Sequence, residues 1–68
     1  MNETVQEFTM RLIRLKEVLR LTGLSRSTIY NRMSKDHFPK PVKLGERMVA
    51  WVESEIEDWI EELIQQRG

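Results

Sequence analysis

The side chains best suited to chemistry lie in one short stretch of this sequence, between residues 25 and 35. If the stretch is helical, a rotation of about 100° per residue puts Ser27 and Asn31 on one side, with Arg26 and Arg32 on its two shoulders. Asparagine can pair with adenine through two hydrogen bonds, and arginine can pair with guanine in the same way. The pattern therefore predicts a helix that contacts double-stranded DNA. Its predicted contact residues are Ser25, Arg26, Ser27, Thr28, Tyr30, Asn31, Arg32 and Lys35.

Two further candidates follow at a predicted turn, where Lys43 and Arg47 flank Gly45. We interpret them as contacts to phosphate or to an adjacent minor groove, because basic residues at a hairpin tip reinforce the field of a nearby basic helix. The alternative is a charge that only protects the edge of the hairpin. Two alternatives also stay open for Tyr30, whose hydroxyl can donate to phosphate or whose ring can cap the core.

The charges support a DNA-facing side although the chain has no net charge. Residues 11–50 carry ten basic and three acidic side chains, a net charge of +7, whereas residues 51–68 carry one basic and six acidic side chains, a net charge of −5. A basic body with an acidic end fits a protein that turns one face to phosphate and keeps the other face away.

Short helices and a glycine turn can position these side chains. Residues 16–22 are expected to form a helix that ends at Gly23, because glycine adopts the left-handed conformation without strain. Ser25 is a good N-cap for the next helix. The spacing brings Ile29 of the second helix against Val18 of the first, which is typical of a helix-turn-helix.

The remaining elements are a hairpin and a last helix. Residues 11–15 suit a short strand or an extended segment before the first helix, and the prolines of residues 36–41 indicate a connector that is not helical. Residues 42–44 and 48–51 are expected to form a hairpin, and residues 53–66 a helix with Ser54 and Glu57 as its capping box. We therefore predict a mainly α fold with a small β-hairpin, a winged helix-turn-helix DNA-binding domain at residues 11–68 after a flexible leader at residues 1–10.

Composition argues against other classes. A chain of 68 residues leaves little room for an enzyme cleft, and it has no cysteine. His37, the one histidine, lies in a predicted turn and is expected at the surface, while Trp51 and Trp59 are expected in the core. We predict no catalytic residue, metal site, cofactor or small-molecule substrate. The polar start and the short apolar runs predict a cytoplasmic protein without a signal peptide or a membrane span.

Four segments resemble one family closely. Residues 14–18 (RLKEV), 22–30 (TGLSRSTIY), 38–45 (FPKPVKLG) and 51–56 (WVESEI) are similar to the AlpA family of prophage regulators, and the resemblance covers nearly all of the chain after Met10. It implies a MerR-like winged fold, kinship with phage excisionases, and transcription control of integrase genes linked to prophage excision. It also implies a recognition helix at residues 25–32 and a wing at residues 43–47. Many members have a small residue where this chain has Glu46, and an acid there disfavours deep insertion of the wing.

Two other functions stay open. The acidic last helix could dock onto a partner protein or a second copy of the chain, which would make the chain an adaptor or a homodimer. An architectural excisionase is the other alternative. The observation that separates an adaptor from a purely DNA-binding domain is whether Ile60, Leu63 and Ile64 are buried by the domain's own core or exposed.

Overall fold

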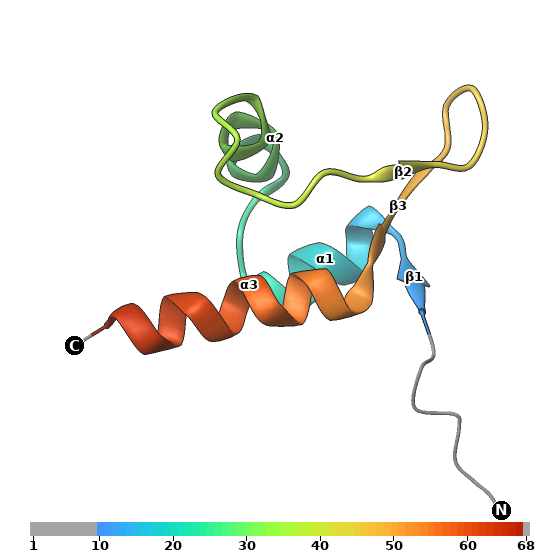
Figure 1. Ribbon diagram of the computed structural model, residues 1–68. Coiled ribbons are helices and arrows are strands. Elements are labelled where there is room, and N and C mark those ends of the chain that lie inside the picture. The colour runs from blue at the N-terminus through green and yellow to red at the C-terminus, as the bar shows by residue number, and fades with distance from the viewer. Residues whose placement is uncertain (1–9, 68) are drawn as a thin grey trace, which may run out of the picture.

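The structure, a computed structural model, describes residues 10–67 and confirms the predicted class. Three helices accompany a small antiparallel sheet (Figure 1). The predicted leader, except for Met10, lies outside the described residues. The elements in chain order are β1 (Leu12–Ile13), α1 (Leu15–Thr22), α2 (Arg26–Ser34), β2 (Val42–Lys43), β3 (Val49–Val52) and α3 (Glu53–Gln66).

The sheet has three strands in the order β1-β3-β2, so the predicted hairpin forms two thirds of it. In the hairpin, Val42 pairs with Ala50 and the amide of Leu44 donates to Met48 O at 2.7 Å. The third strand comes from the segment before α1, where Leu12 pairs with Val52. Of the two alternatives for residues 11–15, the strand is therefore the one observed. Figure 1 shows the hairpin tip reaching away from the helices.

The core lies between one face of the sheet and all three helices. Ile13 and Trp51 occupy that face, and they pack with Val18 of α1, Ile29 of α2 and Ile56 of α3. The expected burial of Trp51 is confirmed, since none of its surface is exposed. Trp59 is only half-buried and packs against the edge of this cluster.

The turn between α1 and α2 forms as its residues predict. Gly23 has a φ of 74°, and its amide donates to Leu19 O at 2.8 Å, which closes the end of α1. Ser25 then caps α2 by accepting a hydrogen bond from the Thr28 amide at 3.2 Å. In Figure 1, α2 is seen end-on while α1 and α3 run across the view, so this turn sets α2 across the other two helices.

The capping box predicted for α3 is wrong. The helix begins at Glu53, directly after β3, and Val52 is its N-cap without a side-chain hydrogen bond. The amide of Glu53 instead donates to Arg11 O at 2.7 Å. Because the backbone next to β1 already accepts from this first turn, Ser54 lies inside the helix and does not cap it.

The connector between α2 and β2 is held by both tryptophans. Trp51 Nε1 donates to Pro39 O and Trp59 Nε1 donates to His37 O, each at 3.0 Å. Between these two carbonyls, Phe38 is buried and meets the Trp59 ring edge-on, with centroids 4.7 Å apart. The sequence predicted a plain turn here and did not single out Phe38, which belongs to the core.

Candidate nucleic-acid interface

A groove with a basic lining lies between the start of α1, the outer side of α2 and the hairpin. Its polar lining includes four basic side chains, of Arg14, Lys16, Arg26 and Arg47, together with Tyr30. The apolar part of the lining is Leu15 and Val49, and no carboxylate takes part. We call this feature the basic groove. Four positive charges from separate segments of the chain make it an attractive place for a phosphate backbone.

The basic groove contains two residues that the sequence did not single out. Arg14 and Lys16 belong to the basic segment of residues 11–50, but they lie ten or more residues before Arg26 along the chain. Packing of α1 against α2 brings them beside it. The charge count was the signal that they belong to a basic face, and only the fold shows which face.

Most of the predicted contact residues on α2 point to solvent. Six of the eight are exposed, namely Ser25, Arg26, Ser27, Tyr30, Asn31 and Lys35, and the other two, Thr28 and Arg32, are half-buried. Tyr30 is 44% exposed and lines the basic groove, so its ring does not cap the core. The Ser25 hydroxyl caps the helix and also lies 2.9 Å from Thr28 Oγ1, within hydrogen-bond distance. These two contacts hold both hydroxyls in place.

Arg32 takes a different position from the other basic residues of α2. Its guanidinium carbon lies 5.9 Å from the ring centroid of Trp59, which is a cation-π geometry. The side chain thus spans from α2 towards α3 and does not line the basic groove. A contact between Arg32 and DNA stays a prediction.

The two basic residues of the hairpin also differ. Both Lys43 and Arg47 are exposed, but only Arg47 lines the basic groove. Lys43 lies on β2 opposite Val49, at the edge of the sheet. Arg47 is therefore the hairpin residue that shares the basic groove with residues of α2. Lys43 is a separate basic position on strand β2, outside the lining of this groove.

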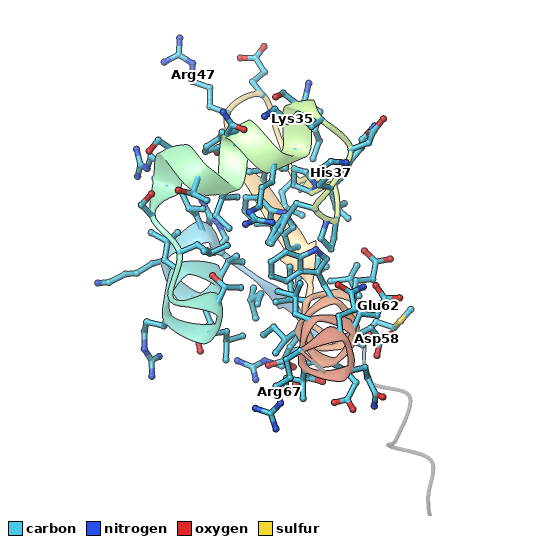
Figure 2. The ribbon with its side chains drawn as sticks, turned by 90° about the vertical axis from the view of Figure 1, so that its left-hand side faces the viewer. Lys35, His37, Arg47, Asp58, Glu62 and Arg67 are labelled. Atoms are coloured by element: carbon cyan, nitrogen blue, oxygen red, sulfur yellow. The ribbon has the colours of Figure 1, made fainter. Side chains whose placement is uncertain are left out.

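The charge separation along the sequence is also a separation in space. Figure 2 shows Lys35 and Arg47 on the side of α2 and the hairpin, whereas Asp58 and Glu62 project from α3 at the other side of the molecule. Because Asp58 and Glu62 are remote from the basic groove, they do not neutralise its field at short range.

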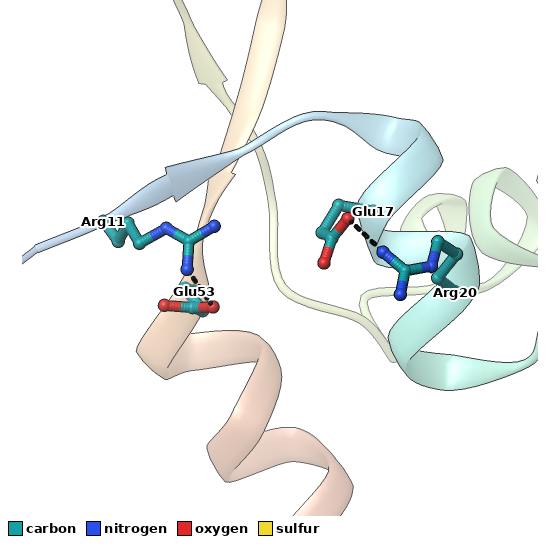
Figure 3. Close-up of polar contacts among 4 residues, drawn as sticks. All are labelled: Arg11, Glu17, Arg20 and Glu53. Carbon is teal, nitrogen blue, oxygen red and sulfur yellow. Dashed lines mark hydrogen bonds and ion pairs between the residues drawn. The ribbon is translucent and has the colours of Figure 1, made fainter.

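Ion pairs involve other basic residues. Arg11 pairs with Glu53 at 3.2 Å and Arg20 with Glu17 at 2.9 Å (Figure 3), and Lys40 pairs with Asp36 at 3.1 Å. Within residues 10–67, none of these pairs includes a basic side chain of the basic groove. Among residues 10–67, the charges of the basic groove are therefore not used in an ion pair.

Three other observations concern features of a different kind. Over the described part of the chain, no three histidine, cysteine or acidic side chains come together as a metal site. His37 is exposed, and its backbone carbonyl binds the indole of Trp59. No helix among residues 10–67 has the length and hydropathy to cross a membrane.

Comparison with known proteins gives consistent results. The sequence profile of the family described as "Prophage CP4-57 regulatory protein (AlpA)" matches residues 11–64. "Uncharacterized protein ORF88" of Enterobacteria phage P4 is 50% identical over 50 residues, which are 74% of this chain and 57% of that protein. The chain thus spans less than two thirds of the phage P4 protein. "DNA-binding transcriptional activator AlpA" of Escherichia coli (strain K12) is 37% identical over 57 residues, covering 75% of this chain and 81% of that protein.

Proposed function

Because the chain belongs to the AlpA family of prophage regulatory proteins, we propose that it is a DNA-binding transcription regulator of phage type. The observation that carries the proposal is the basic groove, where Arg14, Lys16, Arg26 and Arg47 converge without a carboxylate. The protein would act in the cytoplasm, on integrase expression or on prophage excision. The chemistry is binding to double-stranded DNA, without catalysis or a cofactor.

In the proposed complex, α2 lies in the major groove. A helix with its side chains is about 10–12 Å across and the major groove is about 12 Å wide, so one helix fits. Ser27 and Asn31 are exposed on α2 and would face base edges. The hairpin would lie on the backbone or in the adjacent minor groove. The proposed contacts are Ser25, Arg26, Ser27, Thr28, Tyr30, Asn31, Arg32, Lys35, Lys43 and Arg47, and we add Arg14 and Lys16 for phosphate.

A titration followed by fluorescence anisotropy tests the proposal. The full chain is titrated against labelled DNA from its own genomic neighbourhood and against scrambled duplex, each at two salt concentrations. We expect preference for the native DNA and a steep loss of affinity with salt, because each phosphate contact releases counterions and contributes a slope of about one. Equal affinity for both duplexes would refute sequence-specific regulation, and no binding to either would refute DNA binding.

Matched variants assign the contacts. Arg14→Ala and Arg26→Ala should each weaken binding to every duplex and lower the salt slope by about one. Arg20→Ala is the control, because Arg20 lies on α1 but pairs with Glu17 outside the basic groove. Asn31→Ala should also reduce the preference for the native sequence. If Arg20→Ala lowers the salt slope as much as Arg14→Ala, the basic groove is not the phosphate site.

A second candidate function, a protein-interaction adaptor, is favoured by one observation. On α3, Leu63 is 44% exposed and Ile64 is 46% exposed, while Ile60 is half-buried. Carboxylates of Glu61 and Glu62 lie beside them, so this end of α3 suits a partner protein with apolar and basic side chains. The two functions are compatible, because α3 lies away from the basic groove.

A further inference from the structure

The sheet has an apolar face that points away from the core. Opposite residues of antiparallel strands share a face, and alternate residues share it along a strand. Ile13 and Trp51 face the core, so Leu12, Val52, Ala50 and Val42 face the other way. Leu44 and Met48 continue this row beyond the paired residues. We call the row the outer sheet face: Leu12, Val42, Leu44, Met48, Ala50 and Val52.

At the centre of the outer sheet face Ala50 is fully buried and Val52 is half-buried, but the larger side chains around them remain open to solvent. Leu12 is 43% exposed, Val42 41%, and Leu44 and Met48 45% each. The core cluster, with its contributions from all three helices, lies on the opposite side of the strands. Exposed apolar side chains grouped on one face of a sheet commonly mark an interaction surface.

We propose that the outer sheet face is where a second copy of this chain binds. A two-fold contact brings the same patch of both copies together, so the patch must tolerate itself. The outer sheet face carries no charge and meets this condition. The side with the basic groove would repel its own copy, and so would α3 with its five exposed carboxylates Glu55, Glu57, Asp58, Glu61 and Glu62.

This contact is compatible with the proposed DNA binding, although it does not depend on it. Arg47 lines the basic groove, and Lys43 lies opposite Val49, whose side of the strand faces the core. The basic and apolar side chains of the hairpin are thus on different sides. A second copy on the outer sheet face leaves the basic groove of both copies open.

The small area of the contact sets its strength. The strands are two to four residues long, so the contact is smaller than the roughly 800 Å² per partner that a typical stable complex buries. We therefore expect a reversible dimer with a dissociation constant in the micromolar range.

Sedimentation equilibrium of the full chain without DNA tests this proposal. Over roughly 1 μM to 1 mM protein, we expect a monomer–dimer equilibrium. Leu44→Glu places a carboxylate in the apolar contact and should weaken dimerisation at least about tenfold. Leu12→Glu, on the opposite edge strand, should do the same. Ile64→Glu is the control, because it changes an equally exposed aliphatic side chain on α3 and should leave the dimer unchanged.

Several results would overturn the proposal. One is a wild-type chain that remains monomeric over the whole range. Another is a dimer that Ile64→Glu disrupts while Leu44→Glu and Leu12→Glu do not. Circular dichroism of each variant ensures that only folded variants are compared. If Leu44→Glu lowers DNA affinity but leaves self-association unchanged, the outer sheet face contacts DNA and the proposal fails. Because the sedimentation experiment contains no DNA, its outcome is independent of the proposed function.

Discussion

The two tryptophans allow a sharp prediction about stability, because each donates one hydrogen bond to the same connector but from a different environment. Trp51 is fully buried and binds Pro39 O, whereas Trp59 is half-buried and binds His37 O at an exposed position. Phenylalanine keeps an aromatic ring at each position and removes the N–H donor. The comparison of Trp51→Phe with Trp59→Phe therefore tests whether the buried tryptophan contributes more to stability than the half-buried one.

The expected free-energy changes differ by a factor of two or more. At Trp51, the lost donor comes from a fully buried side chain and the hydrogen bond is partly buried, so its loss should cost about 1–3 kcal/mol, and the smaller ring leaves a cavity worth about 1 kcal/mol. At Trp59, water can replace the lost donor, so we expect a total of about 1 kcal/mol. A domain of this length has a total stability of roughly 3–5 kcal/mol, so Trp51→Phe should remove most of it.

Urea denaturation followed by far-ultraviolet circular dichroism measures both changes without using tryptophan fluorescence. The wild-type chain and both variants should show similar dependence on urea, with the midpoint of Trp51→Phe far lower than that of Trp59→Phe. If Trp59→Phe destabilises the chain as much as Trp51→Phe, the argument from burial is refuted. The connector would then depend on the exposed bond as much as on the buried one.

Three further substitutions test the elements around α2. Gly23→Ala should destabilise the chain by about 1 kcal/mol, because a φ of 74° strains alanine although the added Cβ meets no atom within 4 Å. Gly45→Ala is the control and should cost less, because its added Cβ makes only an ordinary contact with Met48 Cβ at 3.9 Å. Ser25→Ala removes the N-cap and should lower stability by about 1 kcal/mol, and an unchanged melting temperature would contradict that role. Arg32→Ala should cost about 0.5–1 kcal/mol through the lost contact with the α3 indole, and a change in DNA preference at unchanged stability would instead indicate base readout.

The sequence predicts the local features of the fold well. Gly23 and Ser25 act over one turn of helix, so their residue types alone indicate where α1 ends and α2 begins. The apolar spacing of the last helix likewise predicts residues 53–66, the range observed for α3. The turn depends on interactions between residues a few positions apart, and the helical period of α3 repeats over the same distance, so both leave a pattern in the sequence.

Features that depend on distant residues were predicted less well. The start of α3 is satisfied by Arg11 O, 42 residues earlier, so the local Ser54 signal for a cap had no effect. Phe38 was hidden among prolines, and its burial depends on Trp59 from α3. The basic groove needs Arg14 and Arg47 to come together across the fold. No local period encodes these contacts, because tertiary packing alone creates them.

The absence of a loop between β3 and α3 limits where the chain can change length. One residue inserted between Val52 and Glu53 would turn α3 by about 100° relative to the sheet, and Ile56 would leave its place in the core. An insertion in the exposed hairpin tip at residues 45–47 would cost only a little additional loop entropy. Length variation among relatives should therefore be concentrated at the hairpin tip, with the junction of β3 and α3 constant in length.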